Sequence, residues 1–395
     1  MPDETKTRIQ KLANAAQISF AERALLKDRN RFLFKINNEA KARRSTRSIV
    51  LGKAKVMSFE DLEEAKVRRA AKDKAAAQKG QCGRKRKEPA KLPEIFKAAS
   101  NSGDDIAGFV HAVGTNVYEF KPGDRVAAFH EMMKPGGSYA EYAVAWQYMT
   151  SHIPDNLSFE EASTIPLAGL TAVVGNYIRL GLPEPWKPAA EKVPFLVYGA
   201  ASAVGAFAIK LARLSNIHPI IGVAGRGIPY AESLIDKTKG DVIIDYRNGN
   251  EAVVAGIKDA LENAGASDIY HAFDAVSDKG SHTDVVAVLA PEGQVTYVFP
   301  LEQTAPPGFS YPKTYKSAQF SNVGDAYGEN RQQGFMYLRW LFRMVMEGKF
   351  TAHPHEVVPG GLAGVSQGLQ NLKAGKASAV KYVYKVPDTE GAGQD

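Results

Sequence analysis

The sequence contains a single cysteine, Cys82, among its 395 residues. One cysteine cannot form an intrachain disulfide, and a thiolate zinc site needs several cysteine or histidine ligands at short spacing. We therefore expect chemistry without a metal. Long apolar runs are also missing, since no segment approaches the roughly 18 apolar residues of a membrane-spanning helix and the first residues lack a secretory apolar core. These absences favour a cytoplasmic protein with no membrane partner.

Charge is divided unevenly along the chain. Residues 1–100 contain 26 Lys and Arg against 12 Asp and Glu, whereas residues 101–395 contain 24 against 31. The first part favours helix by composition but has little apolar periodicity, so its helices would bury no apolar stripe. We expect a basic, partly disordered helical extension over residues 1–98. Its cluster Arg84–Lys87 could bind nucleic acid or direct nuclear import, and we expect no other contact with nucleic acid.

After residue 102 the sequence pattern changes to short β-rich segments separated by turns. Strands are expected at 106–113, 125–129 and 139–145. Ser158, followed three residues later by Glu161, predicts a capping box that opens a helix at about 159–163. A second helix is expected at 168–180, ended by Gly181.

Strands and helices then alternate. Strands are expected at 194–198, 219–224, 242–244, 269–274 and 294–299. The intervening helices are expected at 203–214, 230–238, 251–263 and 281–288. This order predicts an α/β fold with a doubly wound parallel sheet covered on both faces. The remaining residues predict helices at 333–347 and 362–372 and a strand at 379–386.

The turn after the strand at 194–198 consists of small residues from Gly199 to Gly205. A backbone without bulky side chains can approach a pyrophosphate, and the free N–H groups and positive dipole end of the next helix would face it. The glycine pattern is relaxed, and such turns also close ordinary strand–helix units. Its place at the head of an alternating run is the context that a dinucleotide site requires. The sequence therefore predicts a dinucleotide site here.

Cofactor choice is expected at the end of the second strand of this run. That strand ends without a carboxylate and is followed by Arg226, whose guanidinium suits a 2′-phosphate, so NADPH is preferred to NADH. The alternative is that Arg226 is a solvated loop residue. Tyr246 and Arg247 either reach the adenosine side or simply end a strand. Phe299 either borders the nicotinamide or belongs to the core.

Seven short motifs point to a family when they are taken together. They are GDDIAG at 103–108, VG at 113–114, FKPGDRV at 120–126, GSYAEY at 137–142, IPLAGLTA at 165–172, the turn at 199–205 and LKAGKASAVKYV at 372–383. This series resembles the zinc-independent medium-chain dehydrogenase/reductases. The likeness is to quinone oxidoreductase-like proteins and to the trans-acting enoyl reductases of fungal polyketide pathways.

The resemblance implies a domain organisation. A GroES-like β-rich catalytic domain would occupy residues 99–160 and be completed by residues 326–387. A Rossmann domain for NADPH would occupy residues 161–325, followed by a tail at 388–395.

The resemblance also implies an activity, which is hydride transfer from NADPH to an enoyl or quinone-type small molecule without zinc. A polyketide synthase would be a partner. Cofactor contacts would fall on Pro166, Thr171, Ala201, Ser202, Ala203, Val204, Arg226 and Tyr246. The turn and the strand ends predict three further cofactor contacts, which are Gly199, Gly205 and Phe299.

The chain also departs from this family. Such enzymes normally begin with β-structure that lines the substrate side of the nicotinamide, whereas residues 46–87 resemble the C-terminal part of transposon-encoded transposases. Two alternative functions therefore stand beside the reductase, a catalytically silent nucleotide-binding remnant of a fused or truncated gene and a basic nucleic-acid-interacting protein. No sequence motif after residue 103 identifies a proton donor. Tyr139, Tyr142, His130 and His152 are conceivable, but packing or structural roles are the alternative.

Overall fold

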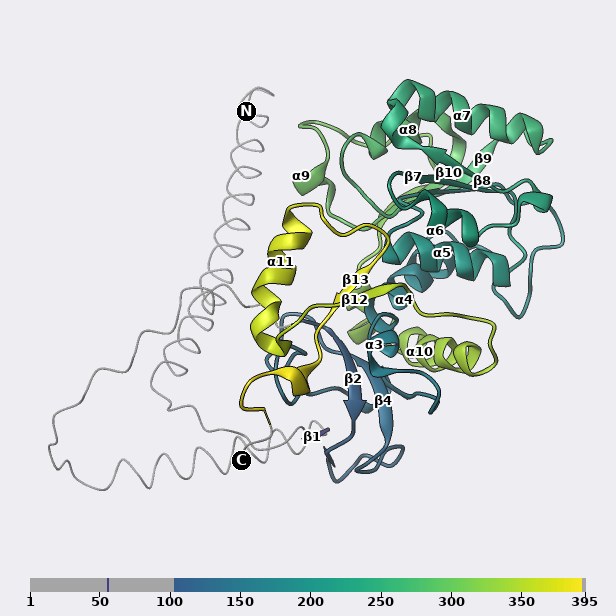
Figure 1. Ribbon diagram of the computed structural model, residues 1–395. Coiled ribbons are helices and arrows are strands. Elements are labelled where there is room, and N and C mark those ends of the chain that lie inside the picture. Colours follow the sequence, from purple (N-terminus) through teal and green to yellow (C-terminus); the bar gives the residue numbers. More distant parts are fainter. Residues whose placement is uncertain (1–54, 57–102, 393–395) are drawn as a thin grey trace, which may run out of the picture. The chain divides into compact units, whose positions relative to one another are not determined.

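The computed structural model describes residues 55–56 and 103–392 (Figure 1). The chain separates into two compact units, Met1–Gly52 and Lys53–Asp395, and all of the described residues belong to the second unit. The basic extension expected at 1–98 and the transposase-like segment at 46–87 lie outside the described residues, apart from the short strand β1 (Lys55–Val56).

The centre of the second unit is a six-stranded parallel sheet in the order β11-β10-β9-β6-β7-β8. Its strands are β6 (Phe195–Tyr198), β7 (Ile220–Ala224), β8 (Val242–Asp245), β9 (Ile269–Asp274), β10 (Leu289–Tyr297) and β11 (Ser317–Phe320). The strand order reverses between β6 and β9, so the carboxyl ends of these two strands flank the point where ligands bind in open α/β sheets. The predicted doubly wound sheet is confirmed.

Helices cover both faces of this sheet. In Figure 1, α7 (Asn250–Asn263) and α8 (Ser281–Val288) lie on one face, and α5 (Ala203–Leu214) and α6 (Ile228–Ser233) lie on the other. Alternate residues of β6 enter different cores, since Phe195 and Val197 pack in one cluster and Leu196 and Tyr198 in another. This alternation is the two-residue period of a strand that is buried on both faces.

The helices α4 (Pro166–Val173) and α10 (Arg331–Met346) belong to the same core cluster as α5. After α4 the chain continues in a wider π-helical segment, η3 (Val174–Arg179). The predicted helix at 168–180 therefore begins two residues early and changes type before Gly181.

The β-rich part of the unit comes from two separate stretches of the chain. An antiparallel sheet has the order β2-β4-β5, from β2 (Asp105–Phe109), β4 (Arg125–Phe129) and β5 (Thr150–His152). Strand β1 pairs with β3 (Ala112–Val113), and β12 (His355–Val357) pairs with β13 (Lys381–Val383), both in parallel. The remaining elements are α3 (Phe159–Ala162), α9 (Leu301–Thr304), α11 (Val365–Lys373), η2 (Gln147–Met149), η4 (Lys237–Lys239), η5 (Tyr246–Asn248), η6 (Val323–Tyr327), η7 (Gly361–Gly364) and η8 (Val386–Asp388).

Local signals in the sequence account for some elements and fail for others. The capping box is confirmed, because Ser158 Oγ accepts from the Glu161 N–H and the Glu161 carboxylate accepts from the Ser158 N–H. The strand expected at 139–145 is wrong. Gly136 has a φ of +92°, and its carbonyl accepts the N–H of Val144, so the segment closes as a loop instead of pairing in a sheet.

Candidate functional site

The turn between β6 and α5 is closely packed around two glycines. Gly199 has a φ of +83°, and a Cβ there would lie 2.5 Å from Val276 Cγ2. A Cβ on Gly205 would lie 2.3 Å from the carbonyl oxygen of Gly199. Side chains are therefore excluded at both positions, which explains why the sequence has glycine there.

Ser202 ends this turn and begins the helix. Its Oγ accepts the N–H of Gly205 at 3.0 Å, which satisfies one of the first N–H groups of α5. The N–H groups of Ala203 and Val204, in the same helical turn, have no partner within the helix. They leave an N-terminal helix end with a partial positive charge at the carboxyl edge of the sheet, beside Ala201.

Arg226 and Tyr246 lie at the same edge. A Cβ on Gly227 would lie 2.5 Å from the Cβ of Ala201, so the loop that carries Arg226 touches the turn. The ring of Tyr246 lies on Gly225, since a Cβ there would lie 2.5 Å from its Cε1, and the Tyr246 side chain stays half-exposed. The structure thus brings together the turn, Arg226 and Tyr246.

The two arginines of this edge differ in charge compensation. Arg226 Nη2 donates to the backbone carbonyl of Gly375, which is a neutral acceptor. Arg247 instead pairs with the Asp245 carboxylate, with Nε 2.9 Å from Oδ1 and Nη2 2.5 Å from Oδ2. The pair lowers the pKa of Asp245 through its hydrogen bonds to Arg247. Within residues 103–392, Arg226 is therefore the one of the two whose charge is not compensated by a carboxylate.

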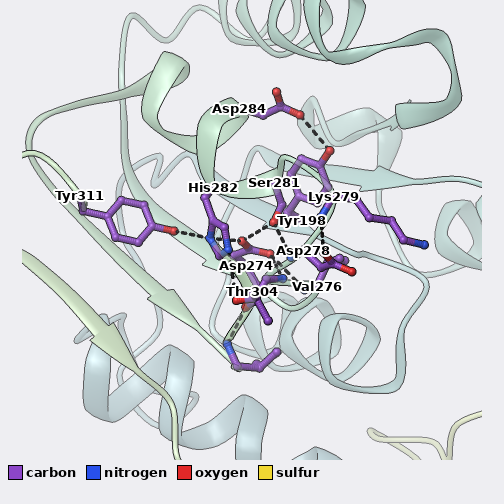
Figure 2. Close-up of polar contacts among 12 residues, drawn as sticks. Tyr198, Asp274, Val276, Asp278, Lys279, Ser281, His282, Asp284, Thr304 and Tyr311 are labelled. Atoms are coloured by element: carbon purple, nitrogen blue, oxygen red, sulfur yellow. Dashed lines mark hydrogen bonds and ion pairs between the residues drawn. The ribbon is translucent and has the colours of Figure 1, made fainter. Parts of the chain in front are cut away.

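The loop after β9 is organised by the buried carboxylate of Asp274 (Figure 2). Its Oδ1 accepts the N–H groups of Val276 at 3.0 Å and Ser277 at 2.7 Å, and its Oδ2 accepts the hydroxyl of Ser281 at 2.6 Å. Burial raises the pKa of Asp274 from its usual value. These contacts hold Ser277 at a φ of +53°, which non-glycine residues rarely adopt.

Ser277 connects this loop to the exit of β10. Its hydroxyl donates to the carbonyl of Asp274 at 3.1 Å and accepts the N–H of Val298 at 2.9 Å. Val298 directly precedes Phe299, whose side chain is exposed, and Val276 lies against Gly199. The loop therefore joins the Gly199–Gly205 turn to the segment that carries Phe299.

A serine, a histidine and an aspartate meet in this network, but they do not form a nucleophilic triad. His282 Nδ1 lies 3.2 Å from the hydroxyl of Tyr311 and 3.4 Å from Asp274 Oδ2. Ser281 donates to Asp274 and not to His282. Ser281 and His282 are both buried. A nucleophile needs a hydroxyl that the histidine can deprotonate and that substrate can reach, so the network fixes the loop and does not attack a substrate.

Pro166 and Thr171 lie on α4, where both are buried. Pro166 occupies the first helical position, which suits its missing N–H. The hydroxyl of Thr171 donates to the carbonyl of Leu167 at 2.7 Å. The Leu167 N–H in turn donates to Asp105 Oδ1 at 2.8 Å, so a carboxylate from β2 caps this helix. This role of Asp105 was not expected from the sequence, although a carboxylate directly before the apolar segment 106–110 was a signal.

The four conceivable proton donors occupy packing positions. Tyr139 meets Tyr384 edge to face at 5.7 Å, and Tyr142 meets His111 at 5.6 Å. Burial raises the pKa of Tyr139. His130 is buried between the carbonyls of Val144 and Lys134, and His152 stacks on Phe120.

The described residues contain neither a cluster of metal ligands nor a helix that could span a membrane. Across residues 55–56 and 103–392, no group of three or more His, Cys, Asp and Glu side chains could hold a metal ion. In the same part of the chain, no helix is both long and apolar enough to cross a membrane.

Comparison with known proteins agrees with the predicted resemblance. The family model of the alcohol dehydrogenase GroES-like domain matches residues 72–155. The trans-enoyl reductase fsr4 of Gibberella fujikuroi is 42% identical over 275 residues, which cover 68% of this chain and 79% of that protein. The trans-enoyl reductase resD of Aspergillus sclerotiorum is 31% identical over 311 residues, which cover 72% of this chain and 85% of that protein.

Solved structures share the fold. The quinone oxidoreductase of Escherichia coli, complexed with NADPH, superimposes with a TM-score of 0.55 at 20% identity and covers 70% of this chain and 79% of its own. The CurK enoyl reductase gives a TM-score of 0.54 at 19% identity, covering 71% of this chain and 78% of its own. With the sequence relatives, the fold and the motifs in agreement, this chain belongs to the medium-chain dehydrogenase/reductases, within their trans-enoyl reductase group.

Proposed function

We propose that this protein is an NADPH-dependent reductase that transfers hydride to an enoyl or quinone-type small molecule. The observation that carries the proposal is the convergence at one sheet edge of the Gly199–Gly205 turn, the N-terminal end of α5 and Arg226, which has no carboxylate partner among the described residues. Relatives named trans-enoyl reductases support the enoyl class, and the quinone oxidoreductase fold supports the quinone class.

The residues at this edge fit a phosphorylated dinucleotide. Gly199, Ala201, Ser202, Ala203, Val204 and Gly205 would hold the pyrophosphate through backbone N–H groups. Arg226 would exchange its neutral carbonyl partner for the 2′-phosphate, because a charged acceptor makes a hydrogen bond roughly twice as strong. The half-exposed ring of Tyr246 would lie against the adenosine. Phe299 would border the nicotinamide, with Pro166 and Thr171 on the opposite helix.

When bound, NADPH would supply the hydride, and the protein would supply position. The Asp274 and Ser277 contacts fix the distance between the turn and Phe299, which sets the register in which the coenzyme and substrate meet. Negative charge that develops on the substrate carbonyl oxygen needs a preorganised donor, and one such donor is typically worth about 2.7–4 kcal/mol. We propose that no zinc takes part, which rests on the single cysteine of the sequence.

The domain organisation is part of the proposal. A GroES-like catalytic domain would comprise residues 99–160 and 326–387, and the Rossmann domain residues 161–325, before a tail at 388–395. The antiparallel sheet of β2, β4 and β5 and the β12–β13 pair support the first domain. We further propose a cytoplasmic enzyme whose substrate is delivered by a polyketide synthase, which is the partner that the resemblance to the trans-acting enoyl reductases implies.

The test is coenzyme binding followed by turnover. Fluorescence titration of the full chain with NADPH and NADH should show tighter binding of NADPH. NADPH oxidation is then followed with a panel of enoyl thioesters, enones and quinones. Binding of neither coenzyme would refute the proposal. Binding without turnover of any acceptor would instead select a catalytically silent nucleotide-binding protein, and salt-sensitive DNA binding that depends on residues 1–98 would select the nucleic-acid function.

A further inference from the structure

A cavity at the amino-terminal edge of the parallel sheet gathers charge that the proposed coenzyme site does not use. It has a volume of about 370 Å³ and is bordered by the end of α5, by the segment 233–239 and by the segment 348–351. The segment 233–239 precedes β8, and His218 in its lining precedes β7. The Gly199 turn, by contrast, follows a strand. Because the strands are parallel, the cavity and the turn lie at opposite edges of the sheet.

The cavity is lined by more positive than negative side chains. Asp236 is the single carboxylate of the lining, against the cations of Lys210, Arg213, Lys239 and Lys349. Lys349 is compensated, since its Nζ lies 2.8 Å from Glu347 Oε2.

The other three cations contact neutral groups. Lys210 Nζ donates to the carbonyls of Thr351 at 2.9 Å and Ala352 at 3.0 Å. Arg213 Nη1 donates to the carbonyl of Leu234 at 2.8 Å, and Lys239 Nζ donates to Asn216 Oδ1 at 2.9 Å. Each of these cations carries more N–H donors than these contacts use. In the part of the chain that the structure describes, none of the three forms an ion pair.

The acidic side chains around the cavity make other hydrogen bonds, although the charges of Lys239 and His218, after the hydrogen bonds from Thr238, also help to lower the pKa of Asp236. The Asp236 carboxylate accepts the N–H and the hydroxyl of Thr238. Asp241 lies 2.8 Å from His218 Nδ1 and also accepts the Ile220 N–H. The three cations without an ion pair outnumber the one carboxylate of the described lining, so the cavity keeps a net positive charge.

The partly buried ammonium of Lys210 is destabilised in its charged form. Burial lowers the pKa of its ammonium to about 8. Its Nζ lies 5.1 Å from the ring centre of Phe207 and 5.8 Å from that of Phe350, and these rings stabilise the cation without neutralising it. An anion beside the ammonium would favour its charged form.

We propose that this cavity binds a phosphate-bearing small molecule, with the phosphate beside Lys210, Arg213 and Lys239 and an apolar portion against Leu234 and Phe350. A second cavity of about 540 Å³ adjoins the first and shares Lys210, Ser233, Leu234 and Thr351 with it, which gives room for the organic portion. This site is separate from the proposed coenzyme site and does not depend on it.

The test measures binding of inorganic phosphate and phenyl phosphate to the full chain by titration calorimetry. The double variant Arg213→Gln/Lys239→Met should weaken the Kd of both probes by about tenfold or more, which corresponds to about 1.4 kcal/mol. Phenyl phosphate should bind more tightly than inorganic phosphate, and affinity should fall as the pH rises through the pKa of Lys210. Lys192→Met is the matched control, because that lysine also donates to a backbone carbonyl but lies outside the cavity; it should leave both Kd values unchanged.

Three results would overturn the proposal. The first is that neither probe binds the wild-type chain. The second is that the double variant and wild type bind the probes with equal Kd values. If the double variant folds poorly, Lys239→Met alone replaces it, because Lys239 is exposed, and an unchanged Kd in that variant overturns the proposal equally. The third is that phosphate binding is lost in Gly205→Val but kept in the double variant, which would place the anion at the coenzyme turn. NADPH titration of the double variant separates this outcome from failure of the proposed function.

Discussion

Lys381 Nζ lies 2.5 Å from Asp105 Oδ2, although the two residues are 276 positions apart. The same carboxylate caps α4 through its other oxygen, and Lys381 also donates to the carbonyl of Thr164 at 3.2 Å. Both side chains are largely buried, with exposed fractions of 21% and 19%. This pair therefore ties together β2, α4 and β13.

Lys381→Met should lower the free energy of unfolding by about 1–3 kcal/mol, because it leaves the partly buried Asp105 carboxylate without its cationic partner. Chemical denaturation measures the loss. Lys385→Met is the control, since Lys385 pairs with Glu160 at 3.0 Å but is 46% exposed, and such pairs contribute at most about 1 kcal/mol. Equal losses in the two variants would contradict a special role for Lys381.

Arg226→Gln should reduce the preference for NADPH over NADH by about tenfold, since a charged hydrogen bond to the 2′-phosphate is lost while NADH has no phosphate there. The measurement is the ratio of the two Kd values from fluorescence titration. Arg247→Gln removes an arginine that is already paired with Asp245 and should leave the ratio unchanged. A shift only in the Arg247 variant would reassign the phosphate contact.

Gly205→Ala should destabilise the protein by about 1–3 kcal/mol and weaken coenzyme binding, because the new Cβ would overlap the Gly199 carbonyl and push the turn open. Thermal unfolding and NADPH titration report the two effects. Gly108→Ala is the matched control, since no atom lies within 4 Å of a Cβ at that position. Unchanged NADPH affinity in Gly205→Ala would count against the turn as the pyrophosphate site.

Ser277→Ala should weaken NADPH binding and lower the stability by about 1 kcal/mol, since the Val298 N–H loses its acceptor and the segment before Phe299 is released. Ser267→Ala, whose hydroxyl bonds only the exposed Asp268 carboxylate, should change neither quantity. If Ser277→Ala alters stability alone, the loop is structural and does not position the coenzyme.

Stability should fall in acid because of two histidines, the buried His353 and the partly buried His271. Burial lowers the pKa of His353 to about 3 and that of His271 to about 4, whereas the unfolded chain binds these protons near the ordinary value of 6.5. As the pH drops from 6.5 towards these values, the unfolded state takes up protons that the folded state cannot, at about 1.4 kcal/mol per pH unit for each histidine. The acid limb of denaturation measured against pH should be less steep for His353→Gln by one proton. An identical slope would show that His353 is protonated in the folded state.

Features set by neighbouring residues were predictable from the sequence. The helix begins at Ala203 because Ser202 caps it, and the glycines at 199 and 205 are required by contacts within one turn. The capping box at Ser158 is equally local. Such elements depend on the identity of a few adjacent residues, so sequence patterns indicate them well.

Contacts between distant segments were not predictable in the same way. Nothing adjacent to Asp105 indicates that its partner is Lys381, and nothing in the sequence shows that the Ser277 hydroxyl accepts from Val298. The sequence indicates Arg226 as the phosphate-binding arginine, but it does not show that Arg247 is paired with Asp245. These outcomes depend on tertiary packing, which a pattern along one chain does not contain.

The ion pair between Lys381 and Asp105 has a consequence for biosynthesis. A ribosome adds about 5–20 residues per second, and Lys381 follows Asp105 by 276 residues. Lys381 is therefore synthesised on the order of tens of seconds after Asp105. During that interval the strands of the first β-sheet are finished but their last electrostatic partner is still being translated. Chaperones can bind the growing chain during this interval. A chain that is truncated before Lys381 would lack the ion pair to Asp105 permanently.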